Sequence, residues 1–164
     1  YFYFLPMSSK YAGVCMSEEN DGKNFFSDGL NFECTRCSNC CRHDPGYVFL
    51  TKKDLSRLMQ ATDLNESKFL ETYCRNVEIG FIERISLTEK SNYDCIFWGE
   101  NGCSVYKHRP LQCRSYPFWS SHLLSPDTWD SEGKNCPGIN HGRLYSEKEI
   151  EKWIRSREKE PLLP

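Results

Sequence analysis

The first clear pattern along the chain is an apolar stripe at helical spacing that follows Thr51. Thr51 and Asp54 stand at the spacing of a capping box, in which each side chain bonds the backbone of the other residue. The apolar positions come three to four residues apart, at Leu55, Leu58 and Met59. We predict a helix that begins after Thr51 and ends near Thr62.

Two further segments show the same helical pattern. Asn65 is a suitable N-cap for the first of them, whose apolar side comprises Phe69, Leu70 and Tyr73. The second opens with Ser146 and Glu149 as another capping box, and its apolar side comprises Ile150, Trp153 and Ile154. Pro161 cannot continue a helix, so we expect this last helix to end before it.

Apolar and polar residues alternate after the second predicted helix, which is the pattern of a β-strand. Val77 and Ile79 flank Glu78, and apolar residues recur at Ile85 and Leu87. The alternation predicts either one bent strand or two short strands.

A second β-prone region covers residues 95–98 and 103–106. The Asn-Gly pair between these two pieces is a strong hairpin signal. Pro110 suits the first turn of a helix, so residues 111–116 are predicted to form a short helical turn. Residues 117–145 are rich in turn-forming residues without a regular period, and we expect a loop there.

Length and composition are consistent with one small domain. The 164 residues fit a single domain, and only 38% of them are hydrophobic, so cross-links, covalent or metallic, are expected to add stability to a thin core. The net charge is −2 and the basic residues are scattered, which argues against a nucleic-acid or membrane surface. No apolar stretch reaches the roughly 18 residues of a transmembrane helix.

The N-terminal stretch looks different from the rest of the chain. Its first six residues are aromatic or apolar, but no basic region precedes them and the run is too short for a signal-peptide core. Residues 16–24 are mostly polar, a composition that buries too little apolar surface to fold alone. We expect residues 1–24 to be a flexible or non-native lead-in, residues 25–160 to form the domain, and the protein to be cytoplasmic.

Ten cysteines carry the strongest chemical signal. Four of them fall within eight residues, at Cys34, Cys37, Cys40 and Cys41. Two-residue gaps allow a tight knuckle to direct two sulfurs onto one metal. Adjacent residues point in different directions, so Cys40 and Cys41 are not expected to share one unstrained mononuclear site.

The obvious candidates to complete the ligand set are the distant cysteines Cys95, Cys103, Cys113 and Cys136. Eight thiolates suffice for two tetrahedral sites or for one cluster with spare thiols, and the spacing leaves both arrangements open. Thiolate ligands fit zinc and iron–sulfur clusters alike. Three cysteines at two-residue gaps are typical of cluster ligation, which slightly favours an iron–sulfur cluster.

The motifs together resemble the YkgJ-type cysteine-cluster family. The resemblance rests on the CxxCxxCC run, on Cys95-Ile-Phe-Trp98, and on the stretch from Cys103 to Phe118 that includes Arg109-Pro110-Leu-Gln-Cys113-Arg114. It covers about residues 32–138 and implies a zinc- or iron-chelating domain with the eight cysteines named above as its characteristic ones. Cys15 and Cys74 lie outside the pattern. A similar cysteine run occurs in the longer flagellin lysine N-methylases, which implies an iron–sulfur cluster and S-adenosylmethionine.

Three functions follow as hypotheses. The first is a metal-binding protein that acts in chelation, delivery or redox sensing, with a metal ion as its partner and an α+β fold around the cysteine-rich centre. The second is an iron–sulfur-dependent modifying enzyme such as a lysine N-methylase. The third is a secreted disulfide scaffold, against which the clustering of the cysteines argues.

Charged residues around the cysteines have two interpretations each. Arg109 and Arg114 flank Cys113, where a guanidinium can offset thiolate charge or form an ordinary carboxylate pair. The four histidines, His43, His108, His122 and His141, are expected to be hydrogen-bonded or solvated more often than metal-ligating.

Overall fold

The computed structural model describes residues 23–164. Cys15 and the predicted lead-in up to residue 22 lie outside these residues. The described chain contains helices α1 (Lys52–Thr62), α2 (Glu66–Tyr73), α3 (Leu111–Ser115), α4 (Pro126–Glu132) and α5 (Glu147–Lys159), together with short antiparallel strand pairs. The predicted α+β class is confirmed.

The three helices predicted from periodicity all form, with the caps that the sequence indicates. Thr51 and Asp54 close the capping box of α1, and Asn65 caps α2 by accepting a hydrogen bond from the backbone of Lys68. Ser146 begins α5 in the same way as Thr51 begins α1. The buried apolar faces of these helices contain Leu55, Leu58, Phe69 and Ile150.

Of the two strand arrangements that the alternation allowed, the structure adopts two short strands. Strands β2 (Cys74–Ile79) and β3 (Ile82–Leu87) form an antiparallel hairpin around Gly80 and Phe81. Gly80 has a φ of 61°, a conformation that glycine adopts at little cost. The predicted Asn-Gly hairpin also forms, with β4 (Trp98–Gly99) paired to β5 (Gly102–Cys103).

The prediction of a loop over residues 117–145 was wrong. This region contains α4 and strand β6 (Arg143–Tyr145), which pairs with β1 (Leu30–Phe32). Helix α4 starts with a capping box of Ser125 and Thr128 and has Trp129 as its one buried residue. A seven-residue helix with a single buried position is too short to show a helical period, so no local pattern indicated α4. Strand β6 pairs with a strand more than 100 residues away, so its local sequence did not indicate it either.

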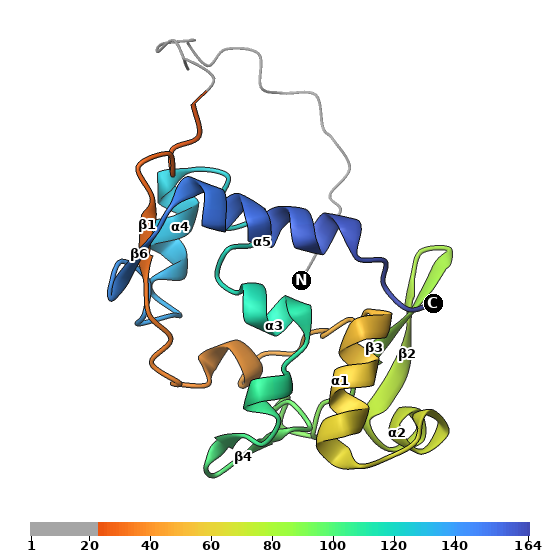
Figure 1. Cartoon of the computed structure of the whole chain (residues 1–164). Helices are drawn as coiled ribbons and strands as arrows, with labels where there is room; N and C mark the ends of the chain where they lie inside the picture. The colour runs from red at the N-terminus through yellow and green to blue at the C-terminus, as the bar shows by residue number, and fades with distance from the viewer. Residues whose placement is uncertain (1–22) are drawn as a thin grey trace, which may run out of the picture.

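The apolar residues form two separate cores on either side of α3 (Figure 1). The first core lies at β1, β6, α4 and α5, and its buried members are Phe26, Phe32, Phe118, Leu123, Trp129, Cys136, Ile139 and Ile150. The second core lies at α1, α2 and the β2–β3 hairpin, and its buried members are Leu50, Leu55, Leu58, Phe69, Leu87, Phe97 and Val105. The segment between β1 and α1 carries the four clustered cysteines from the first core to the second.

No helix in the described part of the chain has both the length and the apolar character needed to cross a membrane.

The first core contains a very close backbone contact that leads to a testable prediction. Glu33 donates its backbone N–H to the carbonyl of Gly138 at 3.1 Å, and a Cβ on Gly138 would lie 2.0 Å from the carbonyl oxygen of Glu33. We expect Gly138→Ala to lower the free energy of unfolding by about 2 kcal/mol, since overpacking forces the backbone apart. Urea unfolding would measure this change.

Gly46→Ala is the matched control, because a Cβ at Gly46 meets nothing within 4 Å. Equal stabilities of the two variants would contradict the proposed close contact.

Candidate metal centre

The four clustered cysteines lie on an irregular segment that reverses direction repeatedly. Arg36 and Ser38, which lie between successive cysteines, have positive φ values of 58° and 70°. A 3₁₀ turn follows at Asn39–Cys41. The left-handed residues turn the chain sharply within each two-residue gap. Three of these cysteines are exposed, and Cys41 is partly buried.

Backbone hydrogen bonds tie this segment to two of the distant cysteines. Cys95 donates its N–H to the carbonyl of Cys41 at 2.9 Å. The Asn39 side chain donates to the carbonyl of Asn135 at 2.9 Å, immediately before Cys136. These contacts bring Cys95 and Cys136 to the cysteine run from segments more than 50 residues away in the sequence.

The thiols are near enough to one another to change each other's protonation. Burial raises the pKa of Cys113, and the charges of Cys95, Cys40 and Cys103 raise it further. A hydrogen bond from Cys41 lowers the pKa of Cys40 to about 7, and the same bond raises the pKa of Cys41.

Cys136 belongs to the same group of thiols. Burial is the main cause of its raised pKa, and charges at Cys37 and Cys40 add to it. Charge effects on the pKa values therefore link Cys40, Cys41, Cys95, Cys103, Cys113 and Cys136, and Cys37 acts on Cys136 in the same way. Cys34 is exposed and is not among the charges that shift these pKa values.

This linkage between thiols does not by itself complete a metal site. Within residues 23–164, no group of three or more His, Cys, Asp or Glu side chains meets the geometry of a metal site. None of the nine cysteines in this part of the chain forms a disulfide. The donor chemistry still fits the expected groups, because the predicted ligands are all thiols and thiolates suit zinc and iron–sulfur clusters.

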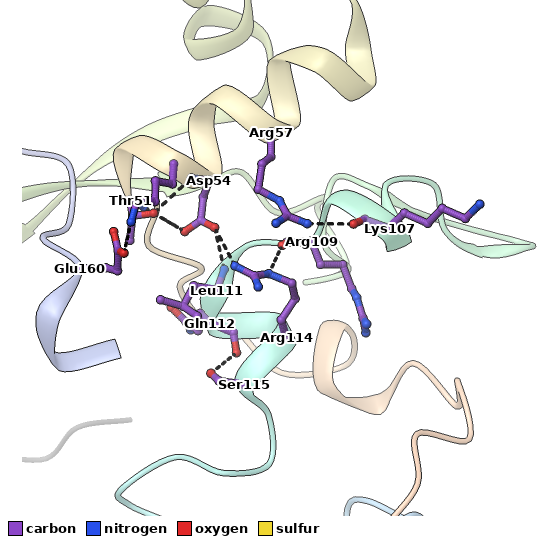
Figure 2. Close-up of polar contacts among 11 residues, drawn as sticks. Thr51, Asp54, Arg57, Lys107, Arg109, Leu111, Gln112, Arg114, Ser115 and Glu160 are labelled. Atoms are coloured by element: carbon purple, nitrogen blue, oxygen red, sulfur yellow. Dashed lines mark hydrogen bonds and ion pairs between the residues drawn. The ribbon is translucent and has the colours of Figure 1, made fainter. Parts of the chain in front are cut away.

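Helix α3 carries Cys113 and is held by a buried carboxylate (Figure 2). Asp54 is only 1% exposed, and its Oδ1 accepts a hydrogen bond from the backbone N–H of Leu111 at 2.8 Å. Its Oδ2 accepts from the backbone and hydroxyl of Thr51 at 3.1 and 2.8 Å. One carboxylate thus closes the capping box of α1 and binds the first N–H of α3.

The residues on either side of Cys113 also hold α3 in place. Gln112 accepts from the N–H of Phe49 at 3.1 Å and donates to the carbonyl of Tyr47 at 2.7 Å, so it binds the chain that follows the cysteine run. Arg114 donates to the carbonyl of Arg109 at 3.0 Å and lies 3.9 Å from Asp54. The sequence patterns did not predict that Asp54 and Gln112 hold α3. The capping box marked Asp54 as a helix cap, and no pattern marked Gln112.

The two arginines that flank Cys113 differ in their contacts: one forms a carboxylate pair, and the other does not. Arg114 forms the ordinary carboxylate pair with Asp54. Arg109 stacks on Tyr106 with its guanidinium carbon 3.6 Å from the ring centroid, and it forms no ion pair within the described residues. Its positive charge acts to lower the pKa of Cys40, Cys103 and Cys113. Arg109 therefore lies where its charge favours the thiolate form of these cysteines.

None of the four histidines joins a metal-binding group in residues 23–164. His122 contacts the carbonyl of Pro117 through Nδ1 at 3.0 Å and stacks on Trp119. His43 and His141 are exposed.

Comparison with known proteins identifies the family of the chain. The family model CxxCxxCC, described as "Putative zinc- or iron-chelating domain", matches residues 33–152, which include all eight predicted cysteines. The chain belongs to the CxxCxxCC family.

A relative of this CxxCxxCC domain is "Uncharacterized protein MJ0661" from Methanocaldococcus jannaschii. The two are 29% identical over 116 residues, which cover 68% of this chain and 58% of the relative. The chain therefore spans somewhat more than half the length of that protein. No solved structure matches the chain.

The shared carboxylate of Asp54 allows a direct test of how α3 is held in this CxxCxxCC domain. Asp54→Asn replaces an oxygen with an NH₂ group that cannot accept from Leu111 or Thr51. We expect a loss of about 2 kcal/mol in the free energy of unfolding, because a buried N–H loses its partner. Glu71→Gln, an exposed change on α2, is the control and should stay within about 0.5 kcal/mol. Comparable losses in both variants would contradict the role of Asp54.

Cys74 differs from the linked thiols, since it lies at the start of β2 and packs against the second core. Burial raises its pKa to about 11. At pH 8 we expect iodoacetamide to modify Cys74 about 100-fold more slowly than an ordinary cysteine, with the rate rising toward pH 11. Because the folded state holds this proton more tightly than the unfolded chain, stability should fall over the same rise in pH.

Mass spectrometry of the alkylated protein would follow Cys74, with Cys74→Ser to assign the peptide. Modification at the rate of a free cysteine peptide would show that Cys74 is not protected.

Proposed function

We propose that this CxxCxxCC domain binds zinc or an iron–sulfur cluster and acts in metal chelation, delivery or redox sensing. The proposed ligands are the eight cysteines Cys34, Cys37, Cys40, Cys41, Cys95, Cys103, Cys113 and Cys136. The single observation that carries the proposal is the match of residues 33–152 to a family described as a "Putative zinc- or iron-chelating domain". Hydrogen bonds that tie Cys95 and the residue before Cys136 to the cysteine run support it.

The residues around the thiols favour a centre with negative charge. A metal bound by four thiolates carries excess negative charge, and Arg109 supplies an unpaired guanidinium beside it. The metal would provide a cation that replaces the thiol protons, and a cluster would in addition provide redox chemistry. The knuckle spacing slightly favours the iron–sulfur cluster.

We further propose a cellular location for the protein and boundaries for its metal-binding domain. A group of free thiols is maintained in reducing compartments, which supports a cytoplasmic location. We take residues 25–160 as the metal-binding domain.

A second candidate function is a modifying enzyme, which a cavity beside α3 favours. The cavity has a volume of about 500 Å³ and is bounded by α1, α3, β6 and α5. Four basic and three acidic side chains line it: Lys53, Arg114, Arg143, Lys152, Asp54, Glu149 and Glu160. Six of these charges pair with one another, Lys53 with Glu160, Arg114 with Asp54 and Arg143 with Glu149. A zwitterionic ligand such as the amino-acid part of S-adenosylmethionine would exchange with the exposed pairs. Saturable binding of S-adenosylmethionine by calorimetry would support the enzyme, and absence of binding to metal-loaded protein would eliminate this candidate.

The proposal predicts the metal content of protein purified without oxygen. Stoichiometric zinc, or iron with acid-labile sulfide and absorption near about 400 nm, would support it. Cys37→Ser and Cys40→Ser should each remove bound metal and lower the melting temperature, because metal binding and folding are linked. Elemental analysis and thermal denaturation measure both effects.

Cys74→Ser is the matched control and should retain the metal, since Cys74 lies outside the proposed ligand set. Unchanged metal content and melting temperature in both the Cys37 and Cys40 variants would refute the ligand assignment.

A further inference from the structure

The indole N–H of Trp98 is buried and has no hydrogen-bond acceptor among residues 23–164. Two other buried nitrogens share this condition, the Nε atoms of Arg57 and Arg75. Both belong to guanidiniums whose other nitrogens donate, to the carbonyls of Lys107 and Gly46 respectively. Trp98 has no second polar atom in its side chain, so its bonding capacity is entirely unused.

An unpaired buried donor is costly enough to require an explanation. Leaving such a group without a partner costs about 1–3 kcal/mol, and native proteins satisfy nearly all of them. An acceptor supplied by a bound group would remove this cost.

Hydrogen bonds hold the backbone of Trp98, and a cation packs on its ring. Its backbone N–H donates to the carbonyl of Cys95 at 2.9 Å, and its own carbonyl accepts from Lys90. The guanidinium of Arg42 lies over the ring, 3.7 Å from the centroid, and is itself held by Asp94 at 3.1 Å. The indole N–H is therefore positioned before any ligand binds.

The residues that hold the ring are the neighbours of three proposed metal ligands. Trp98 stands directly opposite Cys103 in the β4–β5 pair, so both side chains project from the same face of the hairpin. Arg42 follows Cys41 in the chain, and Asp94 precedes Cys95. The unused donor is thus built into the framework of the candidate centre.

We propose that the indole N–H of Trp98 donates a hydrogen bond to a metal-bound cysteine sulfur, with Cys103 as the acceptor. This inference rests on the proposed function. A neutral donor at a ligating thiolate stabilises its negative charge, which slows metal loss and raises the reduction potential of a redox-active centre. Trp98 is a positioning residue for the centre, not a ligand.

The direct test uses protein labelled with ¹⁵N at its indole nitrogens and loaded with ¹¹³Cd, which substitutes for zinc. The Trp98 signal is assigned from its absence in Trp98→Phe. We expect this signal to move downfield on loading and to show scalar coupling to cadmium. Trp119 and Trp129, whose N–H groups already donate to Gln112 and Asn140, should move little.

The outcomes of this experiment separate the two proposals. Stoichiometric cadmium with an unchanged, uncoupled Trp98 signal would overturn the role of Trp98 and leave the proposed function intact. Water would then be the acceptor of the indole N–H. Failure of the folded protein to bind cadmium or zinc, together with failure to hold an iron–sulfur cluster after reconstitution with iron and sulfide, would overturn the proposed function, and the inference with it.

A second measurement follows the retention of zinc. Trp98→Phe should keep the zinc stoichiometry but lose zinc to a chelator about 10-fold faster, the usual scale for partners of metal ligands. Trp153→Phe makes the same ring change on α5, where it packs against the first core, and should leave the rate unchanged. Equal rates in Trp98→Phe and the unaltered protein would contradict the hydrogen bond.

Discussion

The carboxylate of Asp54 is the contact on which the arrangement of α3 depends. A carboxylate removed from water must have its lone pairs hydrogen-bonded, and here the donors come from two different helices. The capping box of α1 and the first turn of α3 therefore form as one unit. Cys113 is two residues from this contact, so the position of its thiol follows from the burial of Asp54. Gln112 and Arg114 add further contacts that hold α3, Gln112 to Tyr47 and Phe49 and Arg114 to Arg109 and Asp54.

The remaining thiols are also held where separately packed parts of the chain meet. Cys136 is buried in the first core, while Cys95 and Cys103 pack against the second. The cysteine run connects the cores and bonds to both sides. This arrangement places several thiols within electrostatic range of one another, so each disfavours the ionisation of its neighbours. A cation at the centre would relieve that repulsion, and the guanidinium of Arg109 already does so in part.

Local signals predicted those elements whose stability is itself local. The helices α1, α2 and α5 each join a side-chain cap to an apolar face, and both features are visible within one short window of sequence. Helix α4 has the cap but only Trp129 as a buried residue, so no period was visible. Strands β1 and β6 have three residues each and are stable only as partners, which no local pattern indicates.

The sequence by itself determined the α+β class, the principal helices, the hairpin at the Asn-Gly pair and the membership of the chain in the CxxCxxCC family. It determined these because caps, periodicity and ligand types are properties of neighbouring residues. Only the tertiary structure decided that Cys95 bonds to the cysteine run, that Asp54 and Gln112 hold α3, and that the N–H of Trp98 is buried without a partner among residues 23–164. Distances between remote segments and the pairing of buried polar groups arise only when the two cores pack against the chain that joins them.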